Sequence, residues 1–352
     1  MISQDQSKSL LAQVRDTIER QFPLTIEGGG SKRFYGYPPS HEVNRLDVSA
    51  HRGVIDYEPA ELVLRVRAGT PLSGIKQLLG ENKQFLAFEP PDFHNRSTIG
   101  GVIASGLSGP RRPYAGSARD FVLGVTLITG SGEILEFGGQ VMKNVAGYDV
   151  SRLLTGSLGT LGVILDVSLK VLPAPELEIT RSIDVARNEF QTLLQSMQRN
   201  MPVSAAAYAD GKLYVRLSGS EVAVMTAGRL IDGDEADNQF WENLNTLVCF
   251  SGVKNLWRVS VAPASKLFLE DADVIDWGGG VRWLADPVYD PREMLATEDG
   301  HATLIKHDRD FLSSGVEIFQ ALTNPVLGIH RKLKAQFDPA GIFNPGRMYK
   351  DI

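Results

Sequence analysis

The sequence has 352 residues, 43% hydrophobic and 22% charged, which is enough apolar material for sizeable cores, and its length suggests two domains. A net charge of -6 and a pI near 5.6 argue against nucleic acid as the main partner, because phosphate binding needs clustered Lys and Arg. The single cysteine, Cys249, excludes an internal disulfide. One thiol also cannot hold zinc or an iron–sulfur cluster, which take about four ligands.

The N-terminal stretch lacks the apolar core of a signal peptide. Leu10, Leu11, Val14 and Ile18 instead recur on one face of a helix predicted over 5–21. No run reaches the roughly 20 apolar residues that a membrane-spanning helix needs. We therefore expect a cytoplasmic protein without a transmembrane segment, attached to the inner membrane, if at all, through partners.

Three consecutive glycines, Gly28, Gly29 and Gly30, stand in the stretch IEGGGSKRFYG (26–36). Glycine triplets are costly, because each glycine loses much backbone freedom on folding. A flexible connection would explain them. A loop whose amides close on a phosphate would explain them too, since it needs a backbone unobstructed by Cβ.

Strands and short helices alternate after this loop. The stretch ELVLRVRAG (61–69) alternates like a half-buried strand. Thr70 is then expected to cap a helix with Pro71 at its first position and Gly80 as its terminator. Further on, DFVLGVTLITGSGEILEF (120–137) predicts two strands joined by a glycine-containing turn.

Two more glycine clusters follow, STIGGVIASGLSGP (97–110) and GSLGTLGVILDVSLKVLP (156–173). Glycines at strand entries also serve simple close packing. Three clusters at strand edges, however, could line one elongated cleft of backbone amides, suited to a long ligand with two phosphates. Neither the P-loop pattern nor the Rossmann glycine pattern is present, so a dinucleotide would require another fold.

Several motifs in order resemble the vanillyl-alcohol-oxidase, or PCMH-type, family of FAD-binding flavoproteins. They are GGGS, STIGGVIASGLSGP, RPYAGSARDFVLGVTLITGSGEIL, KNVAGYDVSRLLTGSLGTLGVI (143–164) and the tail FDPAGIFNPGRM (337–348). The resemblance implies an α+β fold. It divides the chain into a two-part PCMH-type FAD-binding domain (1–173), a cap domain of antiparallel sheet and helices for substrate or partner (174–325), and a C-terminal return to the FAD domain (326–352).

The resemblance also implies which residues hold FAD, chiefly through backbone amides and hydroxyl groups. The matching positions are Gly28, Gly29, Gly30, Ser31, Lys32, Pro91, Ser97, Thr98, Ile99, Gly100, Gly101, Ser105, Gly106, Gly162 and Ile164, with Asn344 and Gly346 of the tail beside the cofactor. Many relatives attach FAD covalently through a histidine in a pattern like GGGH. This chain has Ser31 there, so we expect noncovalent FAD.

A catalytic set is harder to find. Relatives that oxidise 2-hydroxy acids carry a metal-binding set with a Gly-Glu-His-Gly motif, which this sequence lacks, so no metal is expected. His301, His307 and His330 are scattered, and a solvated or core role explains them best. His94, in PPDFHNR, is the candidate base or ligand.

The second half loses the glycine clusters. Helices are expected over 186–200 and 221–231, and a strand over 212–219. Two tryptophans flank WGGGVRW (277–283), which could form a wall near a flavin or a partner surface, although core packing explains both rings more simply.

Within the family, the stretch KNVAGYDVSRLLTGSLGTLG and the compact length are similar to the smaller FAD-binding subunits of bacterial glycolate oxidases. The resemblance implies oxidation of a small 2-hydroxy acid, glycolate to glyoxylate, together with a larger FAD-binding subunit and an iron–sulfur subunit. Two alternatives stay open. One is a free-standing FAD-dependent 2-hydroxy-acid or alcohol dehydrogenase, and the other is an assembly scaffold that no longer binds flavin.

Overall fold

The computed structural model describes residues 3–39, 44–139, 149–295, 299–308, 311 and 315–352. The chain forms two compact units, one of residues 1–107, 117–174 and 322–352, the other of residues 108–116 and 175–321. The boundaries between the two units lie close to the predicted boundaries at 173/174 and 325/326. In addition, residues 108–116 belong to the second unit. The assignment of the first unit to FAD binding and of the second to a cap stays a prediction. No helix in the described ranges has the length and apolar character needed to cross a membrane.

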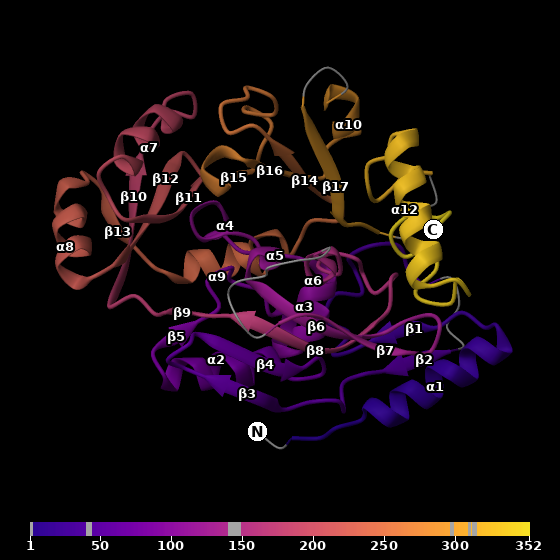
Figure 1. The fold of residues 1–352 in the computed structure, drawn as a ribbon. Helices are drawn as coiled ribbons and strands as arrows, with labels where there is room; N and C mark the ends of the chain where they lie inside the picture. Colours follow the sequence, from indigo (N-terminus) through magenta and orange to yellow (C-terminus); the bar gives the residue numbers. More distant parts are fainter. Residues whose placement is uncertain (1–2, 40–43, 140–148, 296–298, 309–310, 312–314) are drawn as a thin grey trace. The chain divides into compact units, whose positions relative to one another are not determined.

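The first unit combines three small sheets with helices at both ends of the chain (Figure 1). Its helices are α1 (Ser7–Arg20), α2 (Leu72–Glu81), η1 (Phe93–Asn95), α3 (Ile99–Ser105), α5 (Ala118–Phe121), α6 (Val150–Leu153) and α12 (Asn324–Phe337). Its strands are β1 (Thr25–Glu27), β2 (Arg45–Asp47), β3 (Val54–Glu58), β4 (Val63–Arg67), β5 (Gln84–Phe85), β6 (Val122–Ile128), β7 (Ile134–Gly138), β8 (Val163–Lys170) and β9 (Leu172–Pro173). An antiparallel sheet has the order β3-β4-β8-β6-β7, β1 pairs with β2 in parallel, and β5 pairs with β9.

One apolar core joins the two ends of the chain within this unit. Leu10 and Val14 of α1 pack with residues of β6 and β8 and with Ile342 and Phe343 near the C-terminus. All four of these side chains are at most 2% exposed. Burial of this apolar surface is what brings the C-terminal segment back to the first unit.

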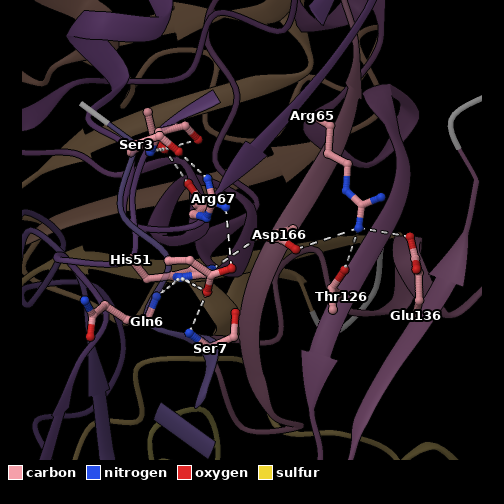
Figure 2. A network of polar contacts seen from close by, with 12 residues as sticks. Ser3, Gln6, Ser7, His51, Arg65, Arg67, Thr126, Glu136 and Asp166 are labelled. Atoms are coloured by element: carbon pink, nitrogen blue, oxygen red, sulfur yellow. Dashed lines mark hydrogen bonds and ion pairs between the residues drawn. The ribbon is translucent and has the colours of Figure 1, made fainter. Parts of the chain in front are cut away.

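A partly buried polar network fixes the segment before α1 to the sheet (Figure 2). His51, 1% exposed, accepts a hydrogen bond at Nδ1 from the Gln6 N–H at 3.0 Å. Its Nε2 therefore carries the proton and lies 3.3 Å from Asp166 on β8. Arg65 on β4 continues the network to Asp166 at 3.7 Å and to Glu136 on β7 at 3.0 Å. Strands β4, β7 and β8 and the N-terminal segment are thus held together by one network of hydrogen bonds and ion pairs.

The second unit is built on one antiparallel sheet, in the order β13-β10-β12-β11-β15-β16-β14-β17. Its strands are β10 (Leu177–Asp184), β11 (Val203–Ala209), β12 (Lys212–Gly219), β13 (Asp234–Ala236), β14 (Leu256–Val261), β15 (Val274–Asp276), β16 (Val281–Ala285) and β17 (Gly300–Lys306). Its helices are α4 (Arg112–Ala115), α7 (Phe190–Gln198), α8 (Glu221–Leu230), α9 (Gln239–Asn245), η2 (Val248–Phe250), η3 (Trp277–Gly279) and α10 (Pro291–Met294). One face of the sheet forms an apolar core with α7 and α8 (Figure 1).

Most predicted elements of both units are present, and the differences are local. The helix expected after Thr70 begins later, with Pro71 as its N-cap, and runs through Gly80 to Glu81. Thr70 does not cap it because its hydroxyl accepts from the Gly53 N–H at 2.9 Å and donates to the Arg67 carbonyl at 2.6 Å. The helix predicted over 186–200 is shorter, Phe190–Gln198.

The two tryptophans of WGGGVRW differ in burial. Trp283 is 8% exposed, as core packing predicts. Trp277 is half-buried, and the Arg112 guanidinium lies 4.2 Å from the centre of its ring. A core role is therefore correct for Trp283 and wrong for Trp277, where a cation stacks on the ring instead.

Candidate functional site

The structure brings the first and second glycine clusters together in the first unit. Lys32 donates to the Ser97 hydroxyl at 2.8 Å, and the hydroxyls of Ser31 and Ser97 lie 3.0 Å apart. The Ser97 hydroxyl also reaches the carbonyl of Pro91 at 3.3 Å, and its N–H donates to Asp92 at 3.0 Å. The loop after β1 and the loop before α3 therefore form one polar site, which we call the two-loop site (28–32 and 91–101).

The bare backbone of the first loop is needed for the close approach of the second. A Cβ on Gly29 would lie 1.6 Å from the carbonyl oxygen of Arg96, and one on Gly28 would lie 2.4 Å from the Thr98 hydroxyl. Gly30 has a φ of 66°, which side-chain-bearing residues rarely adopt. A side chain at Gly28 or Gly29 would push the loops apart, so a flexible connection does not explain the triplet.

Hydrogen-bond donors are left over in the two-loop site. Within the described part of the chain, the amides of Gly28, Gly29 and Gly30 meet no hydrogen-bond acceptor. Burial lowers the pKa of Lys32 to about 8, and Asp92 opposes that shift. By contrast, the first amides of α3 are already used, because Ile99 donates to Thr70 and Gly100 donates to Ala68. Free amides beside an ammonium group suit an anion such as a diphosphate.

Thr98 and Gly101 form the start of α3. The Thr98 hydroxyl caps the helix by accepting from the Gly101 N–H at 3.4 Å. A Cβ on Gly101 would touch only that hydroxyl, at 3.4 Å. The packing of the protein itself therefore does not require glycine at position 101.

The end of α3 meets the third glycine cluster. Gly106 closes α3 in a left-handed conformation, and a Cβ there would lie 3.0 Å from Gly156. Gly156 in turn donates to the Ile103 carbonyl at 2.9 Å. Ser105 bonds within its own helix, and Gly162 and Ile164 lead into β8 beside β6. The part of the motif before this cluster, KNVAGY (143–148), lies outside the described residues.

Asn344 connects the tail with two of the glycine clusters. Its amide oxygen accepts from the Ile26 N–H at 2.9 Å, and its amide nitrogen donates to the Leu158 carbonyl at 2.7 Å. The Gly346 N–H instead donates to the Ile352 carbonyl at 2.9 Å. Asn344 thus ties the tail to the segments that carry the first and third glycine clusters, while Gly346 as a cofactor neighbour stays a prediction.

Two basic residues in or just before the tail motif were not predicted from the sequence as residues of the site. Arg347 donates to the carbonyls of Lys32 and Tyr35 at 3.2 and 2.7 Å, and burial lowers its pKa to about 10. Lys334, with a pKa lowered by burial, donates to the Thr160 carbonyl and to Asp338 at 2.8 and 2.7 Å. Arg347 thus holds the first glycine loop and Lys334 holds the third glycine cluster, and only their place in or just before the tail motif could have signalled this.

His94 lies in the second loop with an exposed side chain and a φ of 57°. Its ring has no hydrogen-bond partner among the residues that the structure describes, so nothing there orients it as a base, and its role stays a prediction. In the same described ranges, no three His, Cys, Asp or Glu side chains gather in a way that could hold a metal ion.

Comparison with known proteins agrees with this geometry. Residues 4–138 match the family model of the FAD binding domain. The chain is 43% identical over 354 residues to glycolate oxidase subunit GlcE of Escherichia coli (strain K12), with 99% of each chain covered. It is 28% identical over 230 residues to glycolate oxidase subunit GlcD of Bacillus subtilis (strain 168), covering 63% of this chain and 48% of that protein.

The fold recurs in a more distant solved structure, an alkyldihydroxyacetonephosphate synthase. The TM-score is 0.69 at 15% identity, over 96% of this chain and 74% of that one. The predicted α+β fold and FAD as the cofactor are confirmed by these matches. The chain belongs to the family of PCMH-type FAD-binding oxidoreductases that includes glycolate oxidase subunit GlcE.

Proposed function

We propose that this chain is the FAD-carrying subunit of a multi-subunit glycolate oxidase, which converts glycolate to glyoxylate. The observation that carries the proposal is the 43% identity to subunit GlcE across 99% of both chains. The shared sequence includes the second unit as well as the FAD-binding domain. A common FAD domain alone would not support a common substrate.

The two-loop site fits FAD through its leftover donors. The amides of Gly28, Gly29 and Gly30 and the Lys32 ammonium would hold the diphosphate, and the Ser97 and Thr98 side chains would complete the second wall. When bound, the flavin supplies a hydride acceptor for oxidation of a CH–OH group. In the sequence Ser31, not histidine, directly follows the glycine triplet, and its hydroxyl faces Ser97, so we propose that FAD is held noncovalently.

We propose that the electrons leave through other proteins. One cysteine in 352 residues cannot hold an iron–sulfur cluster. We therefore propose as partners an iron–sulfur subunit and a larger FAD-binding subunit of the kind represented by GlcD. A cytoplasmic location, with attachment to the inner membrane only through these partners, is part of the same proposal.

Reconstitution tests the proposal. The chain is co-expressed with the larger FAD subunit and the iron–sulfur subunit, and glycolate oxidation is followed with an artificial electron-accepting dye. We expect activity from the three-subunit complex, and little from this chain alone or from the other two subunits without it. Turnover by the chain alone would favour a free-standing dehydrogenase. Full activity without the chain would contradict the proposal.

A further inference from the structure

The eight-stranded sheet of the second unit, called the cap sheet below, carries polar side chains on the face opposite its apolar core. Strands β14 and β17 pair antiparallel, with Arg258 opposite Thr303 and Ser260 opposite His301. Directly paired residues share one face of a sheet, and alternate residues share it along each strand. These four side chains therefore lie on one face. The alternate residues Trp257, Val259, Ala302 and Leu304 belong to the core on the other face.

Arg258 lacks a counterion on this face. In the described part of the chain no carboxylate lies within 4.0 Å of its guanidinium, and its buried Nε has no hydrogen-bond acceptor. Trp283, 8% exposed, is its direct cross-strand partner on β16 and lies on the same face. A partly buried cation without an anion is costly, so an anion bound beside Arg258 would be favourable.

His301 stands diagonally across from Arg258 with an exposed side chain. Desolvation by the surrounding protein lowers the pKa of its imidazole, and the charges of Arg258 and Arg112 lower it further. The ring is thus neutral at pH 7 and keeps one nitrogen as a hydrogen-bond acceptor. A fixed cation and a neutral acceptor on neighbouring strands match a molecule that has a carboxylate next to a hydroxyl group.

We propose that Arg258 and His301 form a binding site for a small 2-hydroxy carboxylate on this face of the cap sheet. The guanidinium binds the carboxylate, and the imidazole accepts a hydrogen bond from the 2-hydroxyl group. The choice of a 2-hydroxy acid rests on the proposed function, whereas the anion site rests on Arg258 and its surroundings alone.

Calorimetric titration of the full chain, loaded with FAD, tests the site. The probes are glycolate, acetate, which lacks the hydroxyl, and ethylene glycol, which lacks the carboxylate. We expect glycolate to bind, acetate to bind more weakly and ethylene glycol not to bind. Arg258→Met should weaken glycolate at least tenfold, and Arg258→Lys should weaken it less because it keeps the charge. Arg229→Met, at an exposed position on α8, is the matched control and should change binding less than twofold.

His301→Gln separates the two contacts. It should remove the preference for glycolate over acetate while leaving acetate binding unchanged. Equal glycolate affinity in Arg258→Met and the wild type, or no glycolate binding by the flavin-loaded chain, would overturn the site. The absorption of bound FAD is measured in every variant, so that failure of the glycolate site can be told apart from failure of the proposed function. A chain that binds FAD but not glycolate would still fit an electron-carrying subunit.

Discussion

We predict that FAD binding depends on pH through Lys32, in a direction that follows from the burial of its ammonium group. Its ammonium lies 2.8 Å from the Ser97 hydroxyl, and burial lowers its pKa from 10.5 to about 8. A bound diphosphate would favour the charged form and raise that pKa again. Binding above pH 8 therefore takes up a proton, and the affinity for FAD must fall as the pH rises.

The size of the effect follows from the fraction of charged Lys32. With a pKa of about 8, roughly 90% of free molecules carry the charge at pH 7, and roughly 10% carry it at pH 9. If the complex keeps the proton at both values, affinity falls about tenfold across this range, or ~1.4 kcal/mol.

Quenching of FAD fluorescence on binding, measured from pH 6.5 to 9.5, gives the affinity of the wild type and two variants. Lys32→Met should bind FAD more weakly and lose the decline between pH 7 and 9, whereas Lys32→Arg should stay charged and bind with little pH dependence. The same decline in Lys32→Met as in the wild type, or no decline in the wild type, would refute the reasoning.

Three other predictions concern the loops, the flavin linkage and the polar network. Gly29→Ala should lower the free energy of unfolding by about 2–3 kcal/mol in urea titration, because its Cβ would lie 1.6 Å from the Arg96 carbonyl. Gly80→Ala, inside α2 with nothing within 4 Å, should be neutral or stabilising by up to ~1 kcal/mol, and equal stability of the two variants would contradict the geometry. Acid precipitation should release all flavin into the supernatant, and a yellow pellet would show a covalent bond. His51→Phe should cost about 1–3 kcal/mol and speed hydrogen exchange of the N-terminal segment, because it leaves the Gln6 N–H without its acceptor and leaves the Asp166 carboxylate with Arg65 alone; unchanged exchange would count against the network.

The fold class and the glycine loops could be predicted because their signals are local. Motifs in a fixed order identified the family, and bare backbone at strand edges predicted close approach. The start of α2 shows where local signals fail. Threonine is a residue type that often caps a helix, but the hydroxyl of Thr70 instead bonds to the distant Gly53 amide and to the Arg67 carbonyl.

Contacts between distant segments lay beyond sequence-based prediction. Arg347 bonds to the Lys32 carbonyl, a residue 315 positions away, and no periodicity reports such a pair. Arg258 and His301 are more than 40 positions apart in the sequence, and their proximity depends on the register between β14 and β17. In the sequence, His301 was one of several scattered histidines, and only the sheet places it beside a cation without a counterion.

The most direct test of the central claim is the flavin content of the purified full-length chain. The chain is incubated with FAD, desalted, and its absorption spectrum compared with its protein concentration. The account predicts close to one FAD per chain, with FAD lost or weakened in Gly101→Ala, whose Cβ the protein alone would accept. A chain that stays colourless after incubation with FAD would contradict it and would favour an assembly scaffold.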